Sequence, residues 1–273
     1  MTDGLSKVDI PVEDRANLLR VAHALADAAG SIILPYFRQA DLSAENKDHG
    51  GFDPVTVADR AAEAAMRAVL AAERPDDAIH GEEAGYQPGT SGLTWVLDPI
   101  DGTRAFISGV PMWGTLIGLD AGAGPVLGLV DQPYIGERFV GAFGSATLRR
   151  GSAEAALAVR PCARLADATL FTTFPEVGSA EEAAAFARVR DQVRLTRYGT
   201  DCYAYALLAM GQVDLVIEAG LNAYDIQGPM AVIEAAGGLV TDWTGGPAHK
   251  GGRVLAAGDP RIHSAAMEFL RDV

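Results

Sequence analysis

The stretch WVLDPIDGT, residues 95–103, takes an apolar run into a turn that carries two carboxylates. Asp98 and Asp101 lie three positions apart, and Pro99 and Gly102 favour a sharp change of chain direction. We expect a strand that brings both carboxylates and an intervening backbone carbonyl to one point. Hard divalent cations such as Mg²⁺ bind oxygen ligands arranged in this way. Asp-Pro and Asp-Gly pairs are equally common in ordinary turns, so this stretch alone leaves both interpretations open.

Two further acidic segments favour the metal interpretation. Glu82 and Glu83 follow a short apolar run, and Asp225 is expected to open a helix after a strand at residues 213–218. Carboxylates at the ends of such elements are placed where the sites of open α/β sheets form. The alternatives are a solvated loop for the Glu pair and a helix N-cap for Asp225.

Composition limits the class of protein. The chain has 273 residues, 49% of them hydrophobic and 21% charged, which is typical of a globular protein with one large domain or two halves. A formal net charge of −14 without a basic stripe argues against a nucleic-acid partner. Cys162 and Cys202 have neither zinc spacing nor a disulfide framework, which favours a reducing cytoplasm. No signal peptide or membrane-spanning run is evident, so we expect no membrane partner.

The order of elements predicts two different halves. Apolar residues from 13 to 37 fall on one helical face, and Pro35 is expected to end or kink this helix. A second helix is predicted from Thr56, its cap, to Arg74. Short apolar runs between residues 78 and 143 predict strands of one largely antiparallel sheet.

After Gly151 strands and helices alternate, which indicates an α/β half. We therefore expect two abutting subdomains, residues 1–150 and 151–273, with a small-molecule site in the cleft between them. Within the helix predicted from Asp225 to Ala236, Pro229 is expected to lie in the first turn, where proline is tolerated.

Four segments in this order resemble the inositol monophosphatase-like phosphatases, and together they cover nearly the whole chain. They are residues 53–59, residues 81–83, residues 98–103 and residues 224–242. The resemblance implies an α/β (α+β) fold, a layered αβαβα sandwich of the inositol monophosphatase and fructose bisphosphatase type. It also implies a Mg²⁺-dependent phosphate monoester hydrolase that acts on a small-molecule ester as a homodimer.

The resemblance assigns metal ligands by position. Glu82, Asp98 and the Ile100 carbonyl would hold one Mg²⁺, while Asp98, Asp101 and Asp225 would hold a second. Glu82 would also hold a third, looser ion, giving two to three ions in all. A catalytically inactive regulatory homologue would usually lack a ligand, and every ligand position is intact here.

The resemblance also assigns the catalytic groups. Asp53 and Thr103 would orient and deprotonate the attacking water. Backbone amides of Gly102 and Thr103 would bind the phosphate, and we expect this backbone to lead into a helix N-terminus, which favours anions.

Three other segments, residues 98–119, 197–203 and 213–218, resemble the histidinol-phosphatase branch of the family. That resemblance implies hydrolysis of histidinol phosphate, a step of histidine biosynthesis, with Arg104, Trp113 and Asp201 as the informative positions. Asp201 and Glu218 would favour a substrate that carries a cationic amine, and Arg104 would contact substrate too. The alternatives are a helix N-cap for Asp201, a surface strand end for Glu218, and inositol 1-phosphate or another ester as the substrate.

Overall fold

The computed structural model describes residues 9–39, 44–46 and 54–273. Its helices are α1 (Val12–Ile33), α2 (Val57–Glu73), α3 (Thr103–Ile107), α4 (Ala180–Arg190), α5 (Tyr203–Ala209), α6 (Ala223–Ala235) and α7 (Pro260–Leu270). A short antiparallel pair is formed by β1 (Ala44–Asn46) and β2 (Pro54–Thr56).

Two larger sheets carry the remaining strands. The eight-stranded sheet has the order β10-β9-β8-β7-β6-β5-β3-β4 and the five-stranded sheet the order β12-β11-β13-β15-β14. The first contains β3 (Ala78–Gly81), β4 (Gly85–Gln87), β5 (Thr94–Asp101), β6 (Gly114–Asp120), β7 (Pro125–Gln132), β8 (Glu137–Ala142), β9 (Ser145–Arg150) and β10 (Ala153–Ala156). The second contains β11 (Thr169–Thr172), β12 (Leu195–Tyr198), β13 (Leu215–Leu221), β14 (Leu239–Thr241) and β15 (Gly252–Ala257).

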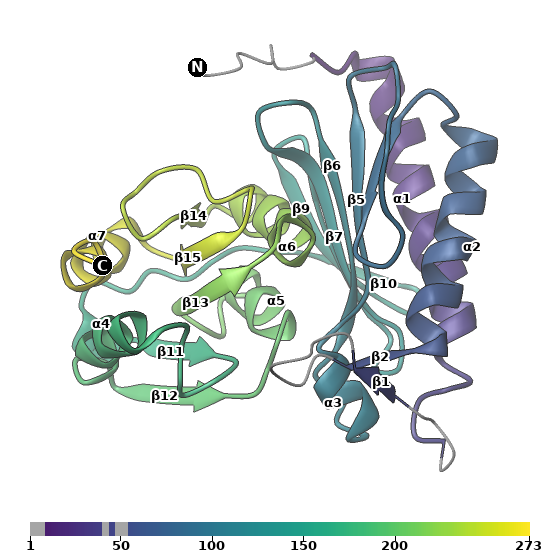
Figure 1. Ribbon diagram of the computed structural model, residues 1–273. Coiled ribbons are helices and arrows are strands. Elements are labelled where there is room, and N and C mark those ends of the chain that lie inside the picture. Colours follow the sequence, from purple (N-terminus) through teal and green to yellow (C-terminus); the bar gives the residue numbers. More distant parts are fainter. Residues whose placement is uncertain (1–8, 40–43, 47–53) are drawn as a thin grey trace.

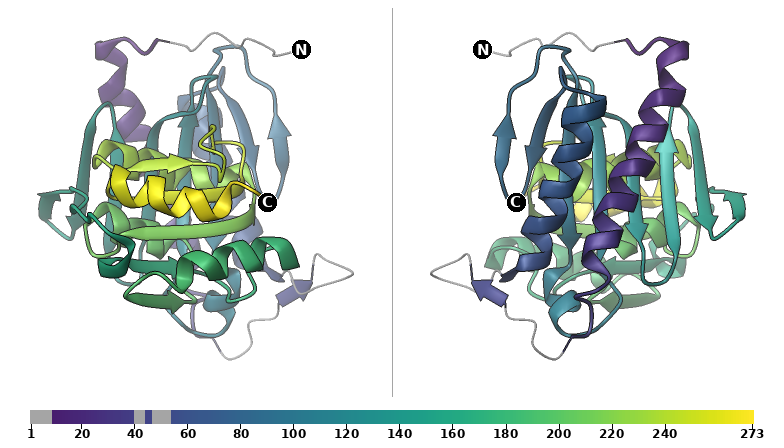
Figure 2. Two further views of the ribbon diagram at one scale, coloured as in Figure 1. Left: turned by 90° about the vertical axis from the view of Figure 1, so that its left-hand side faces the viewer. Right: turned by 90° about the vertical axis from the view of Figure 1, so that its right-hand side faces the viewer.

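The elements stack in five layers (Figure 1). Helices α1 and α2 cover the outer face of the eight-stranded sheet, and α5 and α6 lie between the two sheets. On the far side of the five-stranded sheet, α4 and α7 form the last layer, as the two views of Figure 2 show from either end. The expected αβαβα sandwich is therefore confirmed, with an apolar core at each boundary between a sheet and its helices.

The two outer helices begin and end for local reasons. Helix α1 stops at Ile33, two residues before Pro35, as predicted from the missing amide of proline. Helix α2 starts with a capping box, in which Thr56 Oγ1 accepts from the Ala58 amide at 3.1 Å and Asp59 Oδ2 accepts from the Thr56 amide at 2.9 Å. Both helices bury one apolar face against the sheet, which is why the predicted 3.6-residue spacing was correct.

An irregularity at the end of β5 prepares the site. In a regular strand, side chains three positions apart point to opposite faces of the sheet. The register between β5 and β6 shifts between Asp98 and Asp101, where the ladder is irregular. Because such an irregularity redirects the side chains that follow it, both carboxylates can face the same side of the sheet.

A stripe of glycines lets α6 lie close to the eight-stranded sheet. Gly118, Gly128 and Gly141 pair in register across β6, β7 and β8. A Cβ added at Gly128 would lie 2.1 Å from the carbonyl oxygen of Gly228, and one at Gly141 would lie 2.4 Å from the Ala231 oxygen. Helix α6 therefore packs with its backbone almost on the sheet, and this fixes the position of its first turn.

The position of Pro229 differs from the prediction. Helix α6 begins at Ala223, so Pro229 lies inside the helix rather than in its first turn. Proline has no amide hydrogen, so it cannot donate the helical hydrogen bond to the carbonyl of Asp225, four residues earlier. The sequence placed the helix start two residues too late, because the apolar pattern begins after the capping residues.

Candidate active site

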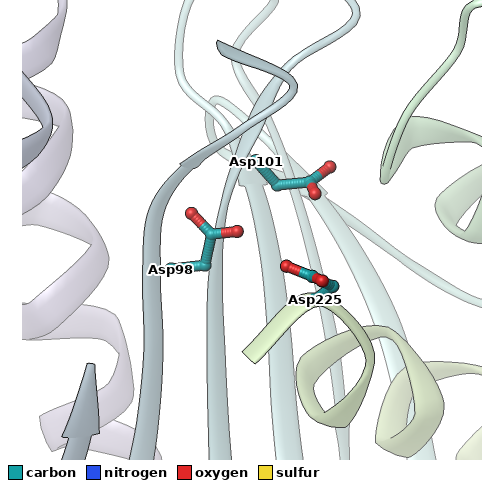
Figure 3. Close-up of side chains that lie close together, drawn as sticks. All are labelled: Asp98, Asp101 and Asp225. Atoms are coloured by element: carbon teal, nitrogen blue, oxygen red, sulfur yellow. The ribbon is translucent and has the colours of Figure 1, made fainter. Parts of the chain in front are cut away.

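Three carboxylates converge where β5 ends and α6 begins. Oxygen atoms of Asp98, Asp101 and Asp225 lie within 4.8 Å of one another. Figure 3 shows the three side chains turned toward a common point from the strand and from the helix. The predicted second metal site is thus a geometric cluster in the described part of the chain.

Backbone amides hold these carboxylates in place. Asp98 Oδ1 accepts from the Ile100 amide at 3.1 Å, and Asp101 Oδ2 accepts from the Cys202 amide at 2.7 Å. Asp225 Oδ2 accepts from the amide of Asn222, the residue that caps α6, at 2.6 Å. Asp225 is therefore not the N-cap itself. It closes the first turn of the helix and faces the cluster at the same time.

The electrostatics of the cluster suit a cation. Burial raises the pKa of Asp98 well above its usual range, and the nearby charges of Glu82, Asp101 and Asp225 raise it further. The pKa of Asp101 is also raised well above its usual value, first by burial and then by the charges of Asp201 and Asp225. Several buried carboxylates that repel one another fit a hard divalent cation, whose charge removes the repulsion and whose preferred ligands are oxygens.

Glu82 and the Ile100 carbonyl, the other predicted ligands, line the same cavity. The Glu82 side chain hydrogen-bonds Asp98, which adds to the rise in the pKa of Asp98, but it lies outside the three-carboxylate cluster. The Ile100 carbonyl accepts from Thr103 Oγ1 at 3.0 Å. Thr103 is thereby directed at a predicted ligand atom.

The predicted phosphate-binding residues lie at the start of α3. Gly102 has a φ of 83° and precedes this helix, and both Gly102 and Thr103 line the cavity. A positive φ favours glycine, which explains the residue type. The expected helix after this turn has only five residues. Asp53, predicted to act with Thr103, lies outside the described residues.

The cavity, of about 310 Å³, extends from the carboxylates to a second pair of acidic residues, Asp201 and Glu218. Asp201 has a left-handed backbone, with a φ of 42°. Helix α5 is preceded by Cys202 and has no side-chain cap, so the N-cap alternative for Asp201 is wrong. Burial raises the pKa of Asp201 to about 6, and the charge of Arg104 opposes that rise.

Glu218 is buried in β13 instead of ending a surface strand, so that alternative is also wrong. Its Oε1 accepts from the Thr173 amide at 2.6 Å and from Thr173 Oγ1 at 2.9 Å. Burial nevertheless raises its pKa to about 7. Burial therefore raises the pKa of both predicted substrate carboxylates.

Arg104 and Trp113, the other two informative positions, lie in different surroundings. Arg104 lines the cavity with its guanidinium 4.9 Å from the ring centre of Phe174, which is half-exposed at the rim. Trp113 does not line the cavity. It is fully buried, with its ring against Phe37 and Phe106. It belongs instead to the apolar core that includes residues of α1 and α2.

Some cavity residues were missed from the sequence. Thr173 and Phe174 follow β11, and Tyr205 lies inside α5. Thr173 and Phe174 could have been found from the sequence, because they lie at the end of a predicted strand of the second half, where α/β sheets place their binding sites. Tyr205 had no such signal, since an aromatic residue inside an apolar helix is normally expected in the core.

Among the described helices, none is long and apolar enough to cross a membrane.

The layered fold and its acidic cavity, with three converging carboxylates, define a class, the small-molecule phosphatases. The chain belongs to the inositol monophosphatase family, whose model matches residues 14–272. It is accordingly a phosphoric monoester hydrolase.

Individual relatives carry different phosphatase names. A chloroplastic bifunctional phosphatase of Arabidopsis thaliana is 45% identical over 92% of this chain and 74% of its own length. A histidinol-phosphatase of Streptomyces coelicolor is 36% identical over 92% of this chain and 96% of its own. The solved structure of an inositol monophosphatase from Zymomonas mobilis has a TM-score of 0.83 and 41% identity, covering 94% of this chain and 98% of that one.

Proposed function

We propose that this protein is a Mg²⁺-dependent histidinol-phosphate phosphatase. The observation that carries the proposal is that two carboxylates with pKa values near neutrality, Asp201 and Glu218, line the same cavity as the three-carboxylate cluster. One end of the cavity suits cations and a phosphate, and the other end suits a cationic organic group.

The chain offers oxygen ligands for two to three Mg²⁺ ions. Asp98, Asp101 and Asp225 would hold one ion, Glu82, Asp98 and the Ile100 carbonyl another, and Glu82 a third. When bound, Mg²⁺ neutralises negative charge on the phosphate and lowers the pKa of water. The raised pKa values of Asp98 and Asp101 support this assignment, since they come from burial and from the repulsion of neighbouring carboxylates, which a bound cation would relieve.

The reaction breaks the bond between phosphorus and the ester oxygen. Water supplies the new oxygen on phosphorus, and the alcohol leaves with a proton. Thr103 and Asp53 would orient the water and accept its proton, and the backbone at Gly102 and Thr103 would donate to phosphate oxygens. The family resemblance supports these roles.

The organic end favours histidinol over inositol. Histidinol phosphate carries an ammonium and an imidazole, whereas inositol phosphate offers hydroxyl groups. A cationic amine next to Asp201 and Glu218 would form charge-assisted hydrogen bonds and stabilise both ionised carboxylates. Histidinol-phosphatases from Streptomyces coelicolor and Chlorobaculum parvum, 36% and 33% identical, are consistent with this choice.

Inositol 1-phosphate is the second candidate substrate. A probable inositol 1-monophosphatase of Mycobacterium tuberculosis is 33% identical over 94% of this chain. The structural neighbour from Zymomonas mobilis is also named for inositol phosphate. Arg104 at the cavity rim could bind hydroxyl groups, but the two carboxylates have no cationic group to meet on such a substrate.

A hydrolysis screen tests the proposal. Purified protein is given histidinol phosphate, inositol 1-phosphate and glycerol 2-phosphate, with Mg²⁺ and with excess EDTA, and released phosphate is measured. We expect the highest kcat/KM on histidinol phosphate and no turnover in EDTA. Full activity in EDTA would overturn the metal assignment, whereas preference for inositol 1-phosphate would overturn only the substrate.

The remaining assignments are also proposals. We propose that the chain works in a reducing cytoplasm as a homodimer of protomers, each with subdomains 1–150 and 151–273. Light scattering on the purified protein would measure its mass in solution, and a monomeric mass would contradict the dimer.

A further inference from the structure

A buried ion pair on α2 contacts the turn that carries Glu82. Glu63 is 1% exposed, and its Oε2 accepts from the Glu83 amide at 2.7 Å while its Oε1 accepts from the Ala84 amide at 3.0 Å. Arg67, one helical turn along, donates from Nε to Glu63 Oε1 at 2.7 Å. We call Glu63 and Arg67 the α2 clamp.

The turn is held from both sides, by the clamp on one side and by β5 on the other. Arg67 also donates to the carbonyl of Gly85, the first residue of β4, at 2.5 Å. On the other side, the Glu82 amide donates to the Leu97 carbonyl of β5 at 3.1 Å. The backbone on either side of the Glu82 side chain is therefore fixed, one side by β5 and the other by the clamp.

The residue type at position 81 agrees with this arrangement. Gly81 has an ordinary backbone conformation, so no positive φ requires glycine there. A Cβ at this position would lie 2.2 Å from Glu63 Oε1 and 2.4 Å from its carboxyl carbon. Glycine is needed at position 81 because the Glu63 carboxylate occupies the space that a side chain would fill.

From these contacts we propose that Glu63 is a positioning residue for Glu82, and that Gly81 makes room for it. Glu63 is not among the residues that line the cavity, and we assign it no metal ion. It fixes the backbone of residues 82–84, so that the Glu82 side chain is directed toward Asp98 and the cavity. The inference rests on the proposed function, because it takes Glu82 to be a metal ligand.

The first test measures Mg²⁺ binding directly, by calorimetry on protein stripped of metal. Glu63→Gln replaces one carboxylate oxygen with an NH₂ group, which cannot accept a hydrogen bond from a backbone amide. One of the two hydrogen bonds from the Glu83 and Ala84 amides is therefore lost. We expect Mg²⁺ affinity to fall by about 10- to 100-fold, the usual cost of removing a group that orients a metal ligand. Turnover at saturating Mg²⁺ should recover most of its unmodified value.

Asp77→Asn is the matched control. Asp77 is also a buried carboxylate paired with an arginine of the α2 end, since it accepts from Arg74 Nε at 2.7 Å and from Trp95 Nε1 at 2.9 Å. It lies before β3 rather than after it, so its loss should lower the Tm without weakening Mg²⁺ binding. Equal Mg²⁺ affinity in the two variants would show that Glu63 only supports the fold, and would overturn the proposal.

The second test is a double-mutant cycle on Tm. Gly81→Ala should lower the Tm clearly in the unmodified chain but little in the Glu63→Ala background, where the space has been emptied. Additive losses would overturn the steric part of the inference. If the unmodified protein binds no Mg²⁺ at all, the proposed function fails instead. The cycle would still report whether Glu63 and Gly81 are coupled.

Discussion

The two ends of the cavity are built differently. At the cation end, Asp98, Asp101 and Asp225 belong to a central strand and to the first turn of a helix packed on a glycine stripe. At the organic end, Asp201 lies in a turn with a left-handed backbone, and Glu218 is held by a residue that follows β11. A strand and a helix thus hold the three carboxylates proposed to bind metal, whereas one of the two carboxylates proposed to contact the substrate, Asp201, lies in a turn. Such a division allows substrate preference to vary while the reaction stays the same.

The largest expected effect comes from the cation end. Asp98→Asn should lower kcat/KM by about 10²- to 10³-fold or more on every ester, because Asp98 is the ligand shared by two proposed ions. Steady-state assays on histidinol phosphate and glycerol 2-phosphate measure this. In metal-free buffer the same variant should show a raised Tm, because one repelling buried charge has been removed.

Glu83→Gln is the control for Asp98→Asn. Glu83 neighbours a proposed ligand in sequence and is given no ligand role. Its kcat/KM should stay close to that of the unmodified protein. If Glu83→Gln were as damaging as Asp98→Asn, the Glu pair would have been assigned in the wrong order.

Much of the cation end could be predicted from sequence. The strand and turn at residues 95–103 place two acidic residues close together, and the cap at Thr56 and the stop before Pro35 follow from local chemistry. These features depend on residues within one turn of each other. Periodicity and turn chemistry are local properties, so they can be read from a short stretch.

The features that aim the carboxylates depend on contacts between distant residues. Asp98 and Asp101 face one side only because β5 loses its register against β6 there. The clamp joins Glu63 to residues twenty positions away, and each looks ordinary in its own segment: an acidic residue in an Ala-rich helix and a glycine before a Glu pair. Asp201 and Glu218 were identified by resemblance, since no spacing rule links a residue in a turn to a residue inside a strand.

The next largest effect is expected at the organic end. Asp201→Asn removes the charge and keeps a residue type that tolerates a left-handed backbone, whereas alanine would add strain. A charge-assisted hydrogen bond contributes about 1.5–3 kcal/mol. We therefore expect kcat/KM on histidinol phosphate to fall roughly ten- to a hundredfold. On glycerol 2-phosphate it should be nearly unchanged, and an equal loss on both esters would mean that Asp201 serves the structure.

A substitution under α6 tests how rigidly the cation end is held. Gly128→Ala places a Cβ against the Gly228 carbonyl and should cost about 1–3 kcal/mol of unfolding free energy, as overpacking of a close contact usually does. The displaced helix would carry Asp225 with it, so Mg²⁺ affinity should fall too. Gly136→Ala is the control, because nothing lies within 4 Å of a Cβ there. Its positive φ still makes it a strained position, so a loss of stability without a loss of Mg²⁺ affinity is the pattern expected of it.

The smallest expected effect is a pH dependence confined to the organic end. With a pKa of about 7, Glu218 is mostly protonated at pH 6 and mostly ionised at pH 8, a change of roughly tenfold in the ionised fraction. A cationic substrate needs the ionised form, so kcat/KM on histidinol phosphate should rise by up to about that factor between these pH values. The phosphate group itself also titrates in this range, so kcat/KM is measured on glycerol 2-phosphate as a control. The prediction concerns the ratio of the two kcat/KM values, which should rise with pH.

The same pKa makes an independent prediction for stability. The folded pKa of Glu218 lies above its usual value of 4.5, so the folded protein binds this proton more tightly than the unfolded chain does. In the absence of substrate, the contribution of Glu218 to stability should therefore decline as pH rises from about 4.5 to about 7. Glu218→Gln has no proton to lose, and its Tm should decline less over this range. If the variant and the unmodified protein gave parallel Tm profiles while their kinetic profiles still differed, the kinetic difference would have to come from substrate contact rather than from the burial of the carboxylate.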